Sequence, residues 1–188
     1  STMGGIYDAY QASQKHKVKL IIGCQFNFVE KIEDAGKSRF RNLILLAKNH
    51  QGYKNLLRLA KASFDHSIVN FKKVYPIIDW EILKTYSQDL ICLTSGSMGI
   101  LGQLISTRNF EGAKATAIKL QEIFGENLGL EIQANSMKRQ VNQYNDWADQ
   151  DLTNRQVIKI AKELNIRIVP TNPAHYLEPD HNEALDVL

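Results

Sequence analysis

Leu128–Gln133 (LGLEIQ) is the middle one of three short apolar runs; the others are Leu90–Thr94 (LICLT) and Ile166–Thr171 (IRIVPT). The runs begin at residues 90, 128 and 166, so each starts 38 residues after the one before it. Short runs that are apolar on both faces are typical of strands in a parallel sheet covered on both sides. The spacing leaves room for a strand, a helix and two loops. It therefore predicts βαβ units with right-handed crossovers, in a barrel or a doubly wound sheet.

Two more runs, Val18–Gly23 (VKLIIG) and Leu43–Ala47 (LILLA), are predicted to be strands on the same grounds. The segments Glu30–Ser38 and Ser67–Ile77 are expected to be loops. Helical patterns occupy most of the remaining chain, with apolar residues repeating every three or four positions. The predicted helices are Gly5–His16, Tyr53–Phe64, Asp79–Tyr86 with Asp79 as its N-cap, Ile100–Ile105, Phe110–Phe124 with Gly125 as its C-cap, Leu152–Leu164 and Asp180–Leu188.

Both ends of the chain suggest a piece of a larger fold. The chain begins directly in a predicted helix, without the strand that the repeat requires, and it ends inside an apolar helix. A complete (β/α) barrel needs about 250 residues, and five strands do not close one. We therefore expect at least one strand–helix unit on the N-terminal side of this chain. The alternative is a small open sheet that is complete as it stands.

Composition excludes several classes of function. The net charge of +3, from 23 basic and 20 acidic residues, is too small to indicate nucleic-acid binding through the field of the protein alone. No apolar stretch approaches the ~20 residues that a membrane span needs, and no signal sequence is visible. The two cysteines, Cys24 and Cys92, lie in apolar runs and suit buried thiols rather than a disulfide framework. These features predict a cytoplasmic protein.

Candidate functional residues follow from the strand positions, because parallel α/β folds place working residues after the carboxyl ends of their strands. The residues at those places are almost all amides and hydroxyls: Cys24, Gln25, Asn27, Asn42 (just ahead of its strand), Ser95, Gly96, Ser97, Gln133, Asn135, Ser136, Asn172, Pro173 and His175. Zinc, magnesium and manganese prefer His, Cys or carboxylate ligands. Only His175 and Glu131 suit these metals, and Glu131 lies within a strand, where it can be a core residue with a partner. No metal site can be assembled from these residues.

Nucleophilic and phosphate-binding patterns are equally weak. A Ser97–His175 pair is conceivable, but no acidic residue is placed to orient the histidine. The glycines Gly96, Gly99 and Gly102 are spaced by three residues, which fits neither glycine-rich phosphate loop. Loop geometry is the preferred explanation for these glycines.

Two stretches carry motifs that are specific to a known family. Leu20–Phe26 (LIIGCQF) resembles the PIIGCEF strand, and Leu43–Asn55 (LILLAKNHQGYKN) the LVLLAKNETGYKN segment, of the PHP domain in bacterial replicative DNA polymerase III α subunits. Further matches keep the same order along the chain: Met3–Tyr10, Ile78–Leu83, Leu93–Ser97, Ala161–Leu164 and Val169–Asp186. The resemblance covers essentially the whole chain. Residues 1–188 are therefore identified as a single PHP-domain fragment, with the polymerase domains outside this chain.

The resemblance implies a partial, distorted (β/α)7 barrel whose first strands are missing. In metal-binding members of the family the site uses a Glu, several His, a Cys and an Asp. Five of the six comparable positions differ here. Gln25 stands where the family has the Glu, Asn42 and Asn135 stand where it has two of the His, Ser97 stands where it has the Cys, and Pro173 stands where it has the Asp. Only His175 keeps the residue type of the family. The resemblance thus implies a degenerate site with no metal, no catalytic residue and no cofactor in this fragment.

Three hypotheses follow for function. The first is a non-catalytic scaffold that supports the polymerase domains of the same protein and docks a separate proofreading exonuclease, while the parent protein acts on DNA with magnesium. The second is an active metal-dependent phosphoesterase or 3′–5′ exonuclease that takes its missing ligands from an N-terminal segment. The third is a generic α/β barrel enzyme with a serine-rich or amide-rich site.

Overall fold

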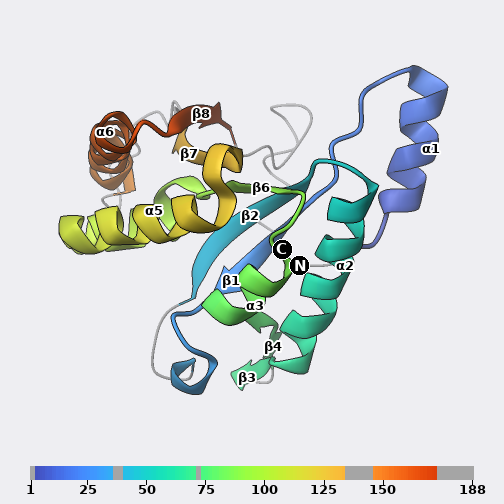
Figure 1. Ribbon diagram of the computed structural model, residues 1–188, viewed down its shortest axis with the longest axis horizontal. Helices are drawn as coiled ribbons and strands as arrows, with labels where there is room; N and C mark the ends of the chain where they lie inside the picture. The colour runs from blue at the N-terminus through green and yellow to red at the C-terminus, as the bar shows by residue number, and fades with distance from the viewer. Residues whose placement is uncertain (1–2, 36–39, 71–72, 134–145, 173–188) are drawn as a thin grey trace.

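Figure 1 shows the computed structural model of the chain, which describes all residues except 1–2, 36–39, 71–72, 134–145 and 173–188. At its centre lies a six-stranded sheet with the order β5-β1-β2-β6-β7-β8. Neighbouring strands are parallel, except that β2 runs antiparallel to both of its neighbours. The expected α/β class with a mostly parallel sheet is thereby confirmed. The strands are β5 (Ile77–Ile78), β1 (Gly23–Phe28), β2 (Arg41–Ala47), β6 (Leu90–Leu93), β7 (Leu128–Gln133) and β8 (Arg167–Thr171).

The helices agree well with the sequence patterns. Asp79 caps α3 by accepting a hydrogen bond from the Ile82 N–H at 3.0 Å, and α5 ends at Gly125, which has a positive φ of 55°. The helix predicted over Asp180–Leu188 lies outside the described residues. The α-helices are α1 (Ile6–His16), α2 (His50–Asp65), α3 (Trp80–Tyr86), α4 (Gly102–Ser106), α5 (Phe110–Phe124) and α6 (Asp146–Leu164), and short 3-10 turns are η1 (Ile32–Asp34), η2 (Gly96–Met98) and η3 (Gly125–Asn127).

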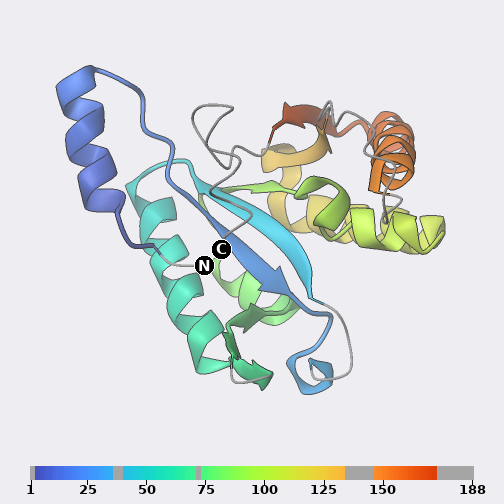
Figure 2. The same ribbon diagram turned by 180° about the vertical axis from the view of Figure 1, so that it is seen from behind.

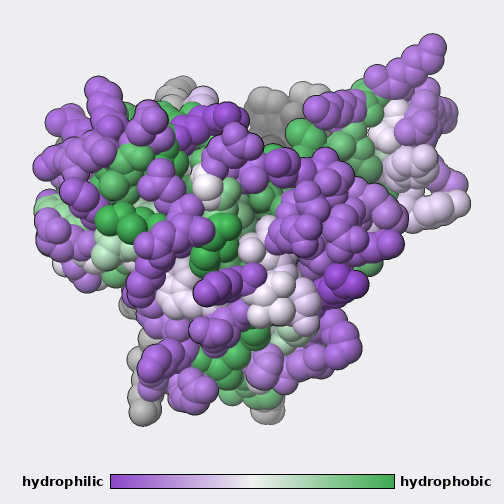
Figure 3. Space-filling model, viewed as in Figure 1, coloured by the Kyte–Doolittle hydropathy of each residue, from purple (hydrophilic) through white to green (hydrophobic). Residues whose placement is uncertain are grey.

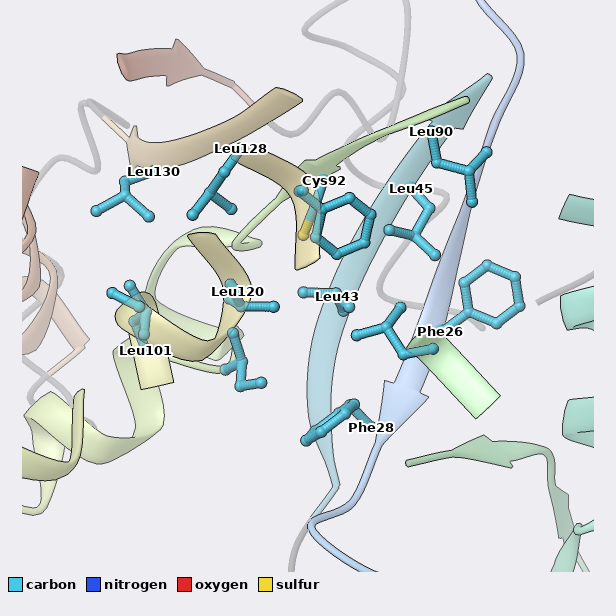
Figure 4. Close-up of a cluster of buried hydrophobic side chains, with 14 of the residues drawn as sticks. Phe26, Phe28, Leu43, Leu45, Leu90, Cys92, Leu101, Leu120, Leu128 and Leu130 are labelled. Atoms are coloured by element: carbon cyan, nitrogen blue, oxygen red, sulfur yellow. The ribbon is translucent and has the colours of Figure 1, made fainter. Parts of the chain in front are cut away.

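Alternate residues of the strands build the core. Cys24, Phe26 and Phe28 of β1 point to the same side as Leu43 and Leu45 of β2, and all five are buried. Helices α2, α3, α5 and α6 pack their apolar residues against this side in one continuous cluster. Figure 4 shows these strand side chains meeting Leu101 and Leu120 from the helical layer. Burial on this face is the main force that fixes the register of the sheet.

The opposite side of the sheet carries the candidate site, and we call it the site face. Gln25 of β1 pairs with Ile44 of β2, Ile44 pairs with Leu93 of β6, and Leu93 pairs with Gly129 of β7. Paired residues share a face and successive residues alternate. Glu131, two residues after Gly129, therefore lies on the site face together with Gln25.

The first strand was placed too early by the sequence pattern. The prediction was Val18–Gly23, whereas β1 begins at Gly23 and ends at Phe28. The run before it is apolar, but Val18 and Ile21 are exposed and lie outside the sheet. The true strand shows alternation of buried and less buried residues. A period of two with one buried face was the stronger signal.

The direction of β2 also differs from the expectation of uniform βαβ units. The connection from Phe28 to Arg41 contains only a 3-10 turn, η1, among its described residues. A parallel neighbour needs a crossover, usually through a full helix, whereas an antiparallel neighbour does not. The segment Glu30–Ser38, predicted as a loop, contains this turn, and its residues 36–38 lie outside the described residues.

The predicted loop Ser67–Ile77 is wrong. It forms a hairpin of β3 (Ile68–Asn70) and β4 (Lys73–Tyr75), followed by β5 at the edge of the main sheet. β-Branched and aromatic residues in this segment favour strands, although polar residues between them obscure the pattern. Pro76 separates β4 from β5, which accounts for the break between the two sheets. Within the described residues the main sheet is open, with β5 and β8 at its edges; closure into a barrel stays a prediction.

The motif LAKN-x-x-GYKN has a structural role at the junction of α2 and β6. Asn49 caps α2 by accepting from the Gly52 N–H at 2.9 Å, and its amide donates to Asp89 at 3.0 Å. The buried Asn55 amide donates to the Gln88 carbonyl at 2.8 Å. A Cβ at Gly52 would overlap the Asp89 carbonyl oxygen, so only glycine allows α2 to approach this closely. The motif fixes α2 to the turn ahead of β6.

Replacement of Gly52 by alanine should destabilise the fold by about 1–3 kcal/mol, because a methyl group would be forced against fixed backbone. Alanine within a helix otherwise gains up to about 1 kcal/mol over glycine. Gly112→Ala is a matched control, since Gly112 also follows an Asn cap by three residues but its Cβ would meet only the Asn109 side chain. Urea denaturation of both variants measures the difference. Equal effects of the two substitutions would contradict the role given to Gly52.

Candidate functional site

Three of the six predicted site positions fall within the described residues. They lie toward the end of the sheet where β1 and β6 finish, and we call this end the site edge. Gln25 of β1 and Asn42 of β2 lie on the site face of adjacent strands. Gln25 pairs with Ile44, and Asn42, two residues before Ile44 in β2, pairs with Asn27. Ser97 lies in η2, and Gly99 just after it forms a parallel bridge with Asn42. Asn135, Pro173 and His175 lie outside the described residues.

Other residues proposed from strand ends have different positions. Cys24 is part of β1 and points into the core, away from the site face. Asn27 is also within β1, and its amide donates to the Pro76 carbonyl at 3.0 Å, which ties β1 to the start of β5. Gln133 is the last residue of β7 and its backbone is held by Asn154 of α6. These residues serve the packing of the fold rather than chemistry at the edge.

The loop after β6 is tightly wound. Ser95 and Gly96 both have positive φ, at 60° and 56°, and the chain turns there into η2. A Cβ at Gly99 would overlap the Thr94 carbonyl, and one at Gly102 would overlap the Gly96 and Ser97 carbonyls. The glycines spaced by three residues are thus required by close backbone approach. This confirms the interpretation of the three glycines as loop geometry.

Glu131 is the only carboxylate that the sequence placed near this edge, and the structure shows what it does. Its side chain is 2% exposed. One carboxylate oxygen accepts from the Ser95 N–H and the other accepts from the Thr171 hydroxyl at 2.8 Å. The Glu131 N–H donates to the Thr94 hydroxyl at 2.9 Å. Glu131 of β7 therefore links the loop after β6 to the end of β8. These hydrogen bonds compensate for the burial of its polar side chain.

We call Thr94, Ser95, Glu131 and Thr171 the Glu131 network. The sequence alone suggested that Glu131 has a partner but did not identify the other three residues. A polar residue within an otherwise apolar strand was the available signal. The partners could not be found because they depend on the register of three parallel strands and on the left-handed conformation of Ser95.

Cys92 lies on the core face of β6 and is fully buried. Burial raises the pKa of its thiol well above the ordinary value of 9.0, and the charge of Glu131 raises it further. A thiol held in its protonated form is a poor nucleophile and a poor metal ligand. Cys92 therefore behaves as an apolar core residue, as the sequence predicted.

The chemistry available at the edge is limited. Among the residues that the structure describes, no group of three or more His, Cys, Asp or Glu side chains is arranged to hold a metal ion. The same part of the chain contains no helix that is both long and apolar enough to cross a membrane. The edge combines neutral amides and a hydroxyl with one carboxylate whose two oxygens both accept hydrogen bonds from the protein.

Comparison with known proteins identifies the class to which this mostly parallel α/β fold belongs. The sequence pattern of the PHP domain matches residues 1–135, so the chain belongs to the PHP domain family. It is similar to DNA polymerase III subunit alpha of Borreliella burgdorferi, with 32% identity over 98% of this chain. It is also similar to the subunits of the same name from Aquifex aeolicus, with 31% identity over 98% of the chain, and from Rickettsia conorii, with 35% over 79%.

The chain is short beside these relatives. It spans 15% of the length of the Borreliella burgdorferi protein and 16% of the Aquifex aeolicus protein. The resemblance inferred from the motifs of the sequence is confirmed, both for the PHP domain and for the polymerase subunits that carry it.

Glu131→Ala should lower the free energy of unfolding by about 1–3 kcal/mol, because it leaves the buried Ser95 N–H without an acceptor and removes the acceptor of the half-buried Thr171 hydroxyl. Glu131→Gln should cost less, since the amide oxygen can still accept from Ser95 and the Thr171 hydroxyl can rotate to accept from the amide. Urea denaturation measures both, with the exposed Glu126→Ala as control. A loss at Glu131 no larger than at Glu126 would rule out the network as a stabilising element.

The raised pKa of Cys92 predicts a pH dependence. The unfolded thiol ionises near its ordinary pKa of 9.0 whereas the folded thiol keeps its proton, so this contribution is complete below pH 9 and is lost as the pH rises. The loss should approach about 1.4 kcal/mol per pH unit. Cys92→Ala should be less stable at neutral pH but should lack this slope. Parallel stability curves for the two proteins between pH 8 and 10 would disprove it.

Proposed function

We propose that this chain is the PHP-domain part of a replicative DNA polymerase α subunit and that it acts as a non-catalytic scaffold. One observation carries the proposal. Gln25, Asn42 and Ser97 lie together at the edge where the family resemblance expects Glu, His and Cys ligands, and all three side chains are neutral and weak ligands.

The electrostatics of the edge support the same conclusion. A divalent cation needs carboxylate, imidazole or thiolate groups that can turn their lone pairs toward it. Glu131 is on the site face, but its two oxygens already accept hydrogen bonds from Ser95 and Thr171. Withdrawing the carboxylate toward a metal would leave the buried Ser95 N–H unpaired, at about 1–3 kcal/mol, and would also remove the acceptor of the half-buried Thr171 hydroxyl.

The partners follow from the scaffold proposal. The length of the similar polymerase subunits supports the presence of further domains in the parent protein. We propose that this chain acts as a scaffold that supports the polymerase domains of that protein. A separate proofreading exonuclease is the second proposed partner. DNA and magnesium belong to the activity of the parent protein, and this activity places the protein in the cytoplasm. The fragment itself is proposed to use no cofactor.

Metal analysis tests the degenerate site. After incubation with zinc or manganese and removal of free metal, the chain should retain far less than one ion per molecule by elemental analysis. It should also release no phosphate from a phosphodiester substrate in the presence of manganese. A stoichiometric metal ion, or activity that His175→Ala removes, would support an active phosphoesterase instead.

Restoring the ligand types provides the matched comparison. The triple variant Gln25→Glu, Asn42→His, Ser97→Cys introduces two ligand groups on the site face and one in η2, and should gain affinity for zinc over the unchanged chain. Gln25→Glu alone should not, because one carboxylate makes no site. Failure of the triple variant to bind zinc while it remains folded by circular dichroism would show that the three positions do not converge.

A further inference from the structure

Helix α1 is more exposed than the other α-helices of the described chain, each of which has buried residues. It contains no buried residue, and two of its aromatic side chains, Tyr7 and Tyr10, are 70% and 52% exposed. Figures 1 and 2 show α1 standing at the outer margin of the molecule, beside α2, in both views. A helix that presents large side chains to solvent on its free side has a surface available for a partner.

The end of α1 and the segment after it are basic. Lys15 and His16 lie in the last turn, Lys17 is the C-cap, and Lys19 follows in the extended segment that leads to β1. All four are exposed. The sequence from residue 9 to residue 29 contains no aspartate or glutamate. This local excess of positive charge contrasts with the small net charge of the whole chain.

The lysines of this segment differ from other basic residues in their pairing. The ion pairs found within the described residues use Arg41, Lys61, Lys114 and Arg155. None of them includes Lys15, Lys17 or Lys19. None of those ion pairs therefore neutralises the three lysine charges, which remain available to a phosphate.

Exposed aromatic and basic groups lie close together along this segment. Tyr7, Tyr10 and Gln14 follow one another at intervals of three and four residues, the spacing that places side chains on one helix face. Lys15, Lys17 and Lys19 lie at and just beyond the carboxyl end of the same helix. Figure 3 shows hydrophilic residues mixed with paler ones over this protruding part, at the upper right of the view. Exposed aromatic rings next to unpaired cations form the surface on which bases stack while phosphates are neutralised.

We propose that Tyr7, Tyr10, Lys15, Lys17 and Lys19, which we call the α1 strip, bind single-stranded DNA. The proposal rests on the proposed function, because that function places the chain in a protein that handles DNA. Interaction with the helix dipole accounts for basic residues in the last turn. It does not account for Lys19, which lies beyond the helix, or for the two exposed tyrosines of α1.

The test is fluorescence anisotropy with a labelled oligothymidylate, titrated with the chain at several salt concentrations. Lys15→Gln, Lys17→Gln and Lys19→Gln together should weaken binding on the order of tenfold or more and reduce the slope of log affinity against log salt by about 2. The control removes the same charge from exposed positions elsewhere, by Lys54→Gln, Lys61→Gln and Lys84→Gln, and should change little. Circular dichroism confirms that each variant is folded.

Tyr7→Ala and Tyr10→Ala separate stacking from charge. They should weaken binding of the oligothymidylate severalfold without changing the salt slope, because they remove ring faces and no charge. Absence of binding by the unchanged chain at low salt, or equal losses in the strip and control variants, would overturn the proposal. Unchanged affinity of the tyrosine variants would overturn its stacking part. A metal found at the site edge would instead contradict the proposed scaffold function, without affecting this measurement.

Discussion

The antiparallel pairing of β2 between β1 and β6 is the constraint on which the arrangement depends. It turns the start of β2 toward the carboxyl ends of β1 and β6, so Asn42 pairs with Asn27 of β1 and bridges to Gly99 in the loop after β6. Its other end leads directly into the Asn49 cap and the close contact of Gly52 with Asp89. One strand direction thus determines both the composition of the site edge and the attachment of α2 to the sheet.

The Glu131 network gives this edge a structural link made of hydrogen bonds within the protein. In a metal site the ion itself holds loops from different strands together. Here a buried carboxylate has that structural effect, because its hydrogen bonds join the Ser95 loop to the end of β8. The backbone of Ser95 in its left-handed conformation is fixed by the same interaction. The geometry of these strand ends is therefore held by groups other than the side chains of Gln25, Asn42 and Ser97.

Local signals in the sequence were sufficient for much of the fold. The bounds of β7 and α5, the Asp79 cap and the Gly125 end follow from period and capping chemistry, which depend on residues close in sequence. The direction of β2 and the hairpin of β3 and β4 were missed, because strand pairing depends on contacts between distant residues. At the site edge, Gln25, Asn42 and Ser97 could be placed from strand ends and family motifs. The partners of Glu131 could not, because they required the register of β6, β7 and β8.

The two edges of the sheet separate two kinds of contact. The site edge lies at the carboxyl end of β1, whereas Lys19 and α1 precede its amino end. Asn42 lies opposite Asn27, the fifth residue of the six-residue strand β1, so a strand of DNA held at α1 does not have to approach Asn42 on the site face. The composition of the site edge near Asn42 therefore places no requirement on the surface at α1. Because the core cluster contains no side chain of α1, the exposed residues of this helix can change while the packing of the sheet is retained.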